Sequence, residues 1–162
     1  MICVKATFDC ELVTEFSSIC ADFEILTLKC AQNIFSVVYR PPSGSSNKVL
    51  CYFDKFLDFS SANKYNFFVG GDFNVNMLTT SSVPCSFKSV LDSNDCVYVI
   101  TSPTHVTSVS STLIDLFITN TDLGSAYGGV IGVQISDHLP IFMIASNVNV
   151  IHCDTPAGIR VF

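Results

Sequence analysis

The pattern of apolar and polar positions in the first quarter of the chain predicts consecutive β-strands. Three runs rich in apolar and β-branched residues are separated by short polar turns: ICVKATF, FEILTLKC and NIFSVVYR, at residues 2–8, 23–30 and 33–40. Such residues favour the pleated, half-buried surface of a sheet. We therefore expect three strands before the break PPSGSS at residues 41–46.

A change of period after this break predicts a helix. In residues 47–61 the apolar side chains recur at helical spacing, and those on the expected inner face are Val49, Leu50, Phe53, Phe56 and Leu57. Ser46 or Asn47 is the expected N-cap. We expect this amphipathic helix to lie with its apolar face on a sheet.

The rest of the chain alternates between predicted strands and one further helix. The strand NFFVGGDFN (residues 66–74) ends in a loop, and the polar connection TTSSVP precedes a helix at residues 85–94. Three strand-like segments follow: STLIDLFITN, VIGVQI and PIFMIASNVNV, at residues 111–120, 130–135 and 140–150. Strands interleaved with only two helices favour a single-domain α/β sandwich with mixed sheets.

Composition and charge narrow the expected partners. The 162 residues are 49% hydrophobic, which suffices for a substantial core, and the net charge of −6 is the opposite of a basic surface that grips nucleic acid by charge alone. A phosphate ligand would need a local site or a metal. We find no apolar segment near the roughly 18 residues of a membrane helix and no apolar leader. We expect no membrane association and an intracellular location, in the nucleus or cytoplasm.

The eight cysteines show no recognisable metal or redox motif. They lie at positions 3, 10, 20, 30, 51, 85, 96 and 153, with no CxxC pair and no Cys/His cluster at zinc spacing. We interpret them as free, small apolar residues in a reducing compartment, where unpaired thiols are tolerated.

Asp72 and Asn74 follow two glycines at the end of an apolar run. In an extended loop, residues two apart project to the same side, so both side chains would meet whatever lies beyond the strand end. The glycines would let the backbone approach a ligand closely, because Gly lacks Cβ. The same residue types are also common in turns, so the turn interpretation stays open at this point.

Three other clusters lie at expected strand boundaries. In ISDHLPIF, Asp137 could ligate a hard cation, and His138 could donate to a phosphoryl oxygen. Asp115 interrupts the apolar run STLIDLFITN, where a carboxylate is costly unless paired, and pairing with His138 would fix the tautomer of that ring. Tyr39 and Arg40 in SVVYRPPSG could contact phosphate, although a tyrosine at a strand end is more often a packing residue.

Taken in order, these clusters resemble a known family. YRPP, GGDFN, the aspartate of STLID and the SDH triplet occur in the order of the endonuclease/exonuclease/phosphatase superfamily. They are most similar to the endonuclease domain of non-long-terminal-repeat (LINE-type) retrotransposons, which resembles apurinic/apyrimidinic endonucleases. The resemblance implies a deoxyribonuclease I-like four-layer sandwich, two mixed β-sheets flanked by helices. The domain is expected over residues 1–147, N-terminally incomplete, with a C-terminal tail at residues 148–162.

The resemblance also implies an activity. The expected function is that of a divalent-metal-dependent phosphodiester hydrolase, an endonuclease that nicks target DNA with Mg²⁺ or Mn²⁺ as cofactor. A reverse transcriptase domain in a longer polyprotein is a further expected partner. Expected substrate-binding residues are Arg40, Thr104 and Ser111.

Each motif residue takes a role from the same resemblance. The expected roles are: Asp72 orients or deprotonates the attacking water; Asn74 positions that water and the phosphate; Asp137 holds the metal; Asp115 orients His138; His138 and Tyr39 donate to the scissile phosphate.

One departure from the family pattern keeps alternatives open. An N-terminal strand carrying an asparagine, and a second strand ending in a metal-ligand glutamate, are not found, and Glu11, Glu15 and Glu24 lie in contexts that do not match. The alternative is a catalytically inactive, truncated remnant that acts at most as a binding module. A third reading keeps the superfamily but has a phosphorylated small molecule, such as an inositol phosphate or sphingomyelin, as substrate.

Overall fold

A mixed seven-stranded sheet lies at the centre of the computed structural model, which describes residues 1–133, 135–146, 148–152 and 158–162. Its strand order is β2–β4–β5–β6–β10–β7, with β3 beside β4. The bounds are β2 Glu11–Leu12, β3 Ser18–Ile19, β4 Glu24–Cys30, β5 Asn33–Tyr39, β6 Asn66–Asp72, β7 Val97–Tyr98 and β10 Asp115–Thr119. Strands β5 and β6 pair in parallel and the remaining neighbours pair antiparallel. The predicted strands at residues 23–30, 33–40 and 66–74 are confirmed.

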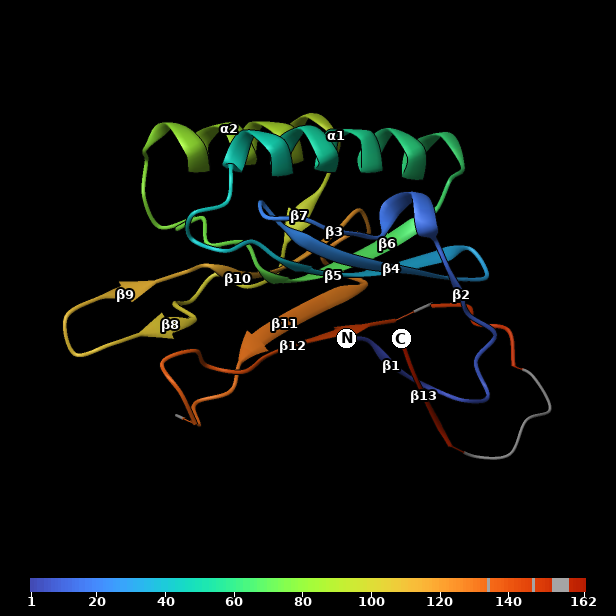
Figure 1. Cartoon of the computed structure of the whole chain (residues 1–162). Coiled ribbons are helices and arrows are strands. Elements are labelled where there is room, and N and C mark those ends of the chain that lie inside the picture. Colours follow the sequence, from blue (N-terminus) through green and yellow to red (C-terminus); the bar gives the residue numbers. More distant parts are fainter. Residues whose placement is uncertain (134, 147, 153–157) are drawn as a thin grey trace.

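Two α-helices lie side by side over one face of this sheet (Figure 1). Helix α1, Ser46–Ala62, connects the parallel strands β5 and β6 and buries four of the five predicted side chains, while Leu50 is partly buried. The N-cap is Ser45, whose hydroxyl accepts a hydrogen bond from the Lys48 N–H at 3.4 Å, so the prediction of Ser46 or Asn47 is wrong by one or two residues.

Helix α2, Ser82–Ser93, begins three residues before the predicted start. Pro84 lies in its first turn, where the missing N–H of proline has no intrahelical partner to lose. Pro84 therefore belongs to the helix, not to the polar connection. Among the described residues, no helix is long and apolar enough to cross a membrane.

Small two-stranded sheets face the other side of the large sheet (Figure 1). They pair β1 Cys3–Lys5 with β13 Ile159–Val161, and β11 Ala126–Val130 with β12 Ile141–Ala145. A third pair, β8 His105–Val106 and β9 Ser111–Thr112, forms a hairpin that projects from the molecule. Helices, large sheet and smaller sheets give the predicted α/β sandwich.

The strand predicted at residues 2–8 is confirmed at Cys3–Lys5, which pairs with β13. Two expectations for this side need correction. The strand expected at residues 130–135 lies earlier, at Ala126–Val130, and Val133 is exposed; Gln134 lies outside the described residues. The segment STLIDLFITN forms two strands, β9 and β10.

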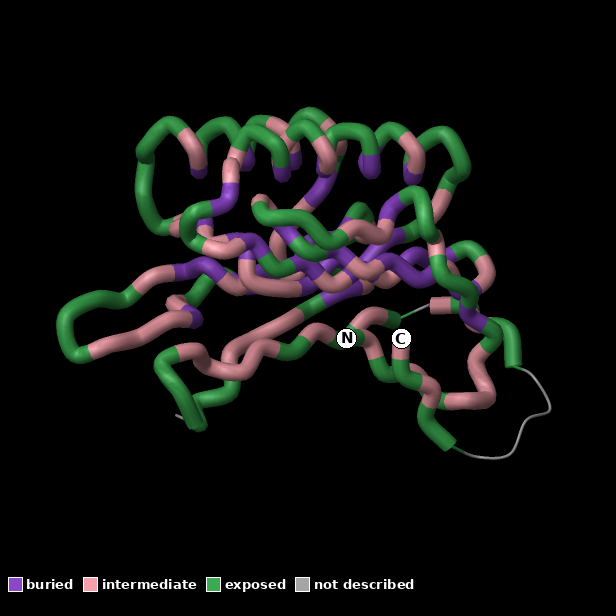
Figure 2. Tube along the Cα trace, in the orientation of Figure 1, coloured by how far each residue is buried: buried purple, intermediate pink, exposed green. Residues whose placement is uncertain are grey.

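The main hydrophobic core lies between the helices and the large sheet. Figure 2 shows buried residues on the inner side of both helices and along the central strands. Phenylalanines dominate it: Phe53 stacks near Phe56 and Phe87, and Phe73 meets both Phe53 and Phe87. Aromatic side chains bury large apolar areas, so this layer packs the helices against the sheet.

Cys10 and Cys30 form a disulfide, which corrects the interpretation of the cysteines as free. Strand β2 pairs with β4 so that Glu11 lies opposite Lys29, and the residues flanking this pair come within a Cα–Cα distance of 4.3 Å. Of the free cysteines in the described residues, Cys96 alone is buried. Cys153 lies outside the described residues. Fewer unpaired thiols weaken the argument for a reducing compartment.

Candidate active site

Four polar side chains lie in one row across the large sheet. The strand register places Glu24 beside Tyr39, Tyr39 beside Asp72, and Asp72 beside Asp115. Residues in register on neighbouring strands project to the same face of a sheet. That face is the one opposite the helices, because the next residues along three of these strands belong to the helix-side core: Ile25, Val38 and Leu116.

The glycines before Asp72 serve strand packing, which corrects the role expected for them. Strand β6 continues through Gly70 and Gly71 to Asp72. A Cβ on Gly70 would lie 2.2 Å from the Phe117 ring, and a Cβ on Gly71 would lie 1.9 Å from the Val38 carbonyl oxygen. Gly71 also has φ +148°, which L side chains rarely adopt. The close approach is therefore to neighbouring strands, not to a ligand.

Asp72 and Asn74 form a turn that joins their side chains. The Asn74 backbone N–H donates to Asp72 Oδ1 at 2.9 Å, while Asn74 Nδ2 donates to Asp72 Oδ2 at 3.0 Å and to the Arg40 carbonyl at 2.7 Å. Asn74 has φ +49°, a conformation that asparagine tolerates. The turn interpretation is confirmed. Because both Nδ2 hydrogens are used, the amide oxygen of Asn74 is the side-chain atom left for a ligand.

Arg40 is buried and holds this turn in place. Its guanidinium donates from Nε to the Phe73 carbonyl at 2.6 Å, from Nη1 to Gly44 at 2.5 Å, and from Nη2 to Asn74 at 2.5 Å. Burial lowers the pKa of Arg40, and the nearby Asp72 carboxylate opposes that shift. Arg40 is 7% exposed, so the expectation that it contacts substrate is not met in this structure.

Asp115 and His138 pair as predicted. His138 Nδ1 lies 3.0 Å from Asp115 Oδ2 and 3.2 Å from Oδ1. Asp115 begins β10 with 15% of its side chain exposed, whereas His138 lies in the loop before β12 and is 37% exposed. An aspartate that accepts from Nδ1 orients the ring and leaves Nε2 available to another partner.

Thr104 connects the segments that carry this pair. Its side chain is fully buried, and its Oγ1 accepts hydrogen bonds from the N–H groups of Ile114 at 3.2 Å and Asp115 at 3.0 Å. The Thr104 carbonyl accepts from the Leu139 N–H at 2.7 Å. The structure therefore gives Thr104 a positioning role in place of the expected contact with DNA.

Asp137 faces His105, a residue that the sequence analysis did not single out. Asp137 Oδ2 lies 3.1 Å from His105 Nε2, and a hydrogen bond at its own backbone N–H, followed by that from His105, lowers the pKa of Asp137. Asp137 was expected to hold the metal, and in the structure it belongs to a ligand group with His105 and His138, not to the group of Asp72. Asp137 and His105 are 32 residues apart, and no spacing in the sequence signals the contact.

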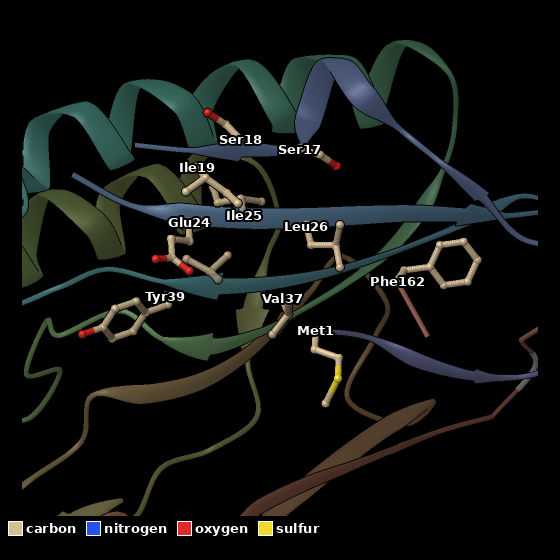
Figure 3. A pocket seen from close by; sticks show the side chains of 11 residues that line it. Met1, Ser17, Ser18, Ile19, Glu24, Ile25, Leu26, Val37, Tyr39 and Phe162 are labelled. Atoms are coloured by element: carbon tan, nitrogen blue, oxygen red, sulfur yellow. The ribbon is translucent and has the colours of Figure 1, made fainter. Parts of the chain in front are cut away.

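Tyr39 and Glu24 line one end of a pocket of about 700 Å³ on the same face of the sheet (Figure 3). Tyr39 is 44% exposed, so its hydroxyl is accessible. Glu24 is the N-terminal glutamate that shares the row of Asp72, whereas Glu11 pairs with Lys29 Nζ at 2.8 Å. Ser111 is exposed on strand β9 of the projecting hairpin.

Two groups of potential metal ligands share His138. One combines His138 with Asp72 and Asp115, and the other combines it with His105 and Asp137. Within each group the ligating atoms lie within 4.8 Å of one another. In the first group, burial raises the pKa of Asp72, as does the Asp115 charge, while the hydrogen bond from Asn74 opposes the shift. A half-buried carboxylate with raised pKa is typical of sites that bind cations or transfer protons.

Solved structures share this fold at low sequence identity. The endonuclease domain of TRAS1, a telomere-specific non-LTR retrotransposon, matches with a TM-score of 0.68 and 13% identity over 87% of this chain and 70% of that chain. The cytolethal distending toxin of Haemophilus ducreyi matches with 0.57 and 19%, over 85% of this chain and 58% of that chain. The beta toxin of Staphylococcus aureus, a mutant with bound magnesium ions, matches with 0.50 and 14%, over 76% and 57%.

Sequence comparison assigns the family. No curated protein sequence matches the chain. A family model described as endonuclease-reverse transcriptase matches residues 33–142, more than half of the chain and the span that contains every residue of the candidate site except Glu24. The chain therefore belongs to this endonuclease-reverse transcriptase family and has the endonuclease/exonuclease/phosphatase fold.

Proposed function

We propose that this chain is a divalent-metal-dependent phosphodiester hydrolase that nicks target DNA. The observation that carries the proposal is that the ligating atoms of Asp72, Asp115 and His138 lie within 4.8 Å of one another, where β6 ends and β10 begins, in a chain of the endonuclease-reverse transcriptase family. In this proposal the chain acts inside the cell, in the nucleus or cytoplasm, and works with a reverse transcriptase domain in a longer polyprotein.

The residues present fit Mg²⁺ or Mn²⁺. Both ions prefer oxygen ligands, and the carboxylate of Asp72, with the free amide oxygen of Asn74 on the same turn, supplies them. Asp115 adds a second carboxylate to the group. When bound, such a cation would polarise the phosphoryl oxygen and stabilise the leaving oxygen.

The Asp115–His138 pair supplies an oriented proton donor. With Nδ1 held by the carboxylate at 3.0 Å, protonated His138 can donate from Nε2 to a phosphate oxygen as negative charge builds up there. Tyr39, whose register neighbour is Asp72, adds a hydroxyl donor on the same face.

Asp72 is suited to accept a proton from water. Its pKa is raised by burial, and a base is more effective as its pKa approaches the working pH. The hydrogen bonds from Asn74 to both carboxylate oxygens fix the orientation of this base. Asn74 therefore positions Asp72 as well as the phosphate.

A second candidate function is binding without catalysis. It is favoured by the pairing of Asp137 with His105, which leaves the Asp72 group without that carboxylate. Glu24 is the carboxylate in the same row that can compensate, from two strands away. If the site is catalytic, Glu24→Gln should strongly reduce the rate of nicking. If the chain only binds DNA, the same substitution should leave its affinity for DNA unchanged.

The test is nicking of supercoiled plasmid with Mg²⁺, Mn²⁺ or EDTA. Wild-type protein should nick with either metal and not with EDTA, and His138→Gln should reduce the rate by at least about 100-fold, as expected for loss of a general acid. His152→Gln is the matched control, since His152 packs against the Phe8 ring and belongs to neither ligand group. Folded wild-type protein that binds DNA without nicking would establish the binding module instead.

A further inference from the structure

The second ligand group, His105, Asp137 and His138, has a composition different from that of the first. It contains two imidazoles and one carboxylate, whereas the Asp72 group contains two carboxylates and one imidazole. Imidazole nitrogen suits Zn²⁺ and related transition metals, while carboxylate oxygens suit Mg²⁺ and Mn²⁺. The two groups should therefore select different cations.

Backbone pairing brings the two histidines together. His105 and His138 are opposite partners in an antiparallel bridge, and their rings meet edge to face with centroids 4.8 Å apart. The Val106 N–H donates to the Asp137 carbonyl at 2.8 Å, and the Leu139 N–H donates to Thr104, so both sides of the bridge are fixed. Directly opposite residues of such a bridge project to the same side, which places both rings over one spot.

Each histidine already has a supporting partner at one ring nitrogen. His138 Nδ1 is held by Asp115, and His105 Nδ1 lies 3.5 Å from Thr112 Oγ1. Histidine ligands of metals characteristically have such a partner on the nitrogen that does not bind the metal. Both Nε2 atoms are thereby left for ligation, and His105 Nε2 already lies 3.1 Å from Asp137 Oδ2.

The dimensions of the group suit a tetrahedral ion. Ligand atoms about 2.0–2.1 Å from zinc are separated by about 3.4 Å in a tetrahedron. The His105–Asp137 distance of 3.1 Å is close to this value, and the side chain of Asp137 is 60% exposed. Three protein ligands leave a fourth position open to water or substrate.

We propose that His105, Asp137 and His138 form a Zn²⁺ site that competes with catalysis. Zinc bound there occupies His138 Nε2, the atom from which the proposed reaction needs a proton. The consequence for catalysis rests on the proposed function, whereas zinc binding itself does not. Zinc is accordingly an inhibitor of nicking, acting without displacing the cation at the Asp72 group.

Binding is tested by the imidazole NMR signals of the full chain, which has three histidines. Addition of one equivalent of Zn²⁺ should shift the ring signals of His105 and His138 together and leave His152 unchanged. His105→Gln and, separately, Asp137→Asn should weaken the zinc-dependent shift of His138 by more than about tenfold in zinc concentration. Exposed thiols also bind zinc, but they do not move these ring signals.

Two results would overturn the zinc site. One is an unchanged His105 ring at saturating zinc, and the other is a His138 response that is the same in both variants as in wild type. Backbone amide spectra of each variant, compared with wild type before zinc is added, establish that the His105–His138 bridge is intact. His152→Gln serves as the matched control and should keep the wild-type response.

Inhibition is tested in a separate arm. Nicking in excess Mg²⁺ should fall at least about tenfold on addition of Zn²⁺ in wild type, while His105→Gln, normalised to its own zinc-free rate, should resist. Equal inhibition of both proteins would overturn the proposed competition. If wild type does not nick with Mg²⁺ at all, the proposed function fails, and the NMR titration still decides the zinc site.

Discussion

At the scale of single residues, the surroundings of Asp72 disfavour its negative charge. It is half-buried, its neighbour across the sheet is the carboxylate of Asp115, and burial raises its pKa above the ordinary value of 3.8. A raised pKa in the folded protein means that the proton binds more tightly there than in the unfolded chain. The stability that this proton contributes is fully present below pH 3.8 and is lost as the pH rises through the raised value.

Asp72→Asn should therefore raise the melting temperature at neutral pH while abolishing nicking. Asparagine keeps one oxygen that can accept from the Asn74 N–H and loses the acceptor for Asn74 Nδ2, so the turn keeps its backbone hydrogen bond without the charge. The measurement is thermal unfolding of both proteins from pH 3 to pH 8. The difference in stability should grow with rising pH above 3.8. A variant less stable than wild type at pH 8 would contradict this account.

The site residues that could be predicted individually are those whose neighbours in the sequence make an unpaired side chain costly. Asp115 sits in an apolar run, and that alone called for a counterion such as His138. Nothing local distinguishes His105, whose role comes from a strand bridge with a loop more than thirty positions later. Arg40 and Thr104 were expected to contact substrate, Arg40 as a guanidinium at a strand end and Thr104 from the family resemblance, but both satisfy backbone groups in the interior.

At the scale of elements, Thr104 is the point where three segments meet. Its hydroxyl accepts from two backbone N–H groups at the start of β10, and its carbonyl holds the loop that carries His138. Without the hydroxyl, two buried donors would lose their partner. Each unsatisfied buried group costs about 1–3 kcal/mol.

Thr104→Val should lower the free energy of unfolding by about 2 kcal/mol or more and slow nicking beyond that loss of folded protein. Thr104→Ser keeps the hydroxyl and is the matched control, expected to nick at nearly the wild-type rate. Urea unfolding gives the stability, and plasmid nicking below the unfolding transition gives the activity. Equal nicking rates in the two folded variants would show that the Thr104 hydroxyl is not needed to position Asp115 for catalysis.

Elements were predictable where their signal is contained within a dozen residues. Strands β4 and β5 and helix α1 follow from the change between strand and helical spacing. The helix boundaries were missed by one to three residues, since caps depend on a single side chain. The pairing of β1 with β13 joins the two ends of the chain, and no local pattern encodes such a contact.

At the scale of the whole molecule, the Cys10–Cys30 disulfide links the residue before β2 to the last residue of β4, across a sequence separation of 20. A cross-link over a loop of this size stabilises a protein by about 3 kcal/mol, chiefly through the unfolded chain. Cys10→Ser should therefore lower the melting temperature, and dithiothreitol should lower that of wild type to a similar value. Cys85→Ser, at an exposed free thiol, is the control. Wild-type melting that is indifferent to reductant would show the two cysteines to be unpaired in solution.

The register of β5 against β6 determines both which residues reach the core and which reach the polar row. Sliding β5 by one position would preserve most backbone hydrogen bonds, yet it would exchange odd and even residues between the faces. Tyr39 would then leave the row of Asp72, and a molecule with normal secondary structure would be chemically inert. The same slip would expel Ile34 and Val38 from beneath the helices. Packing of the hydrophobic core therefore selects the same strand register that aligns the polar row on the opposite face of the sheet.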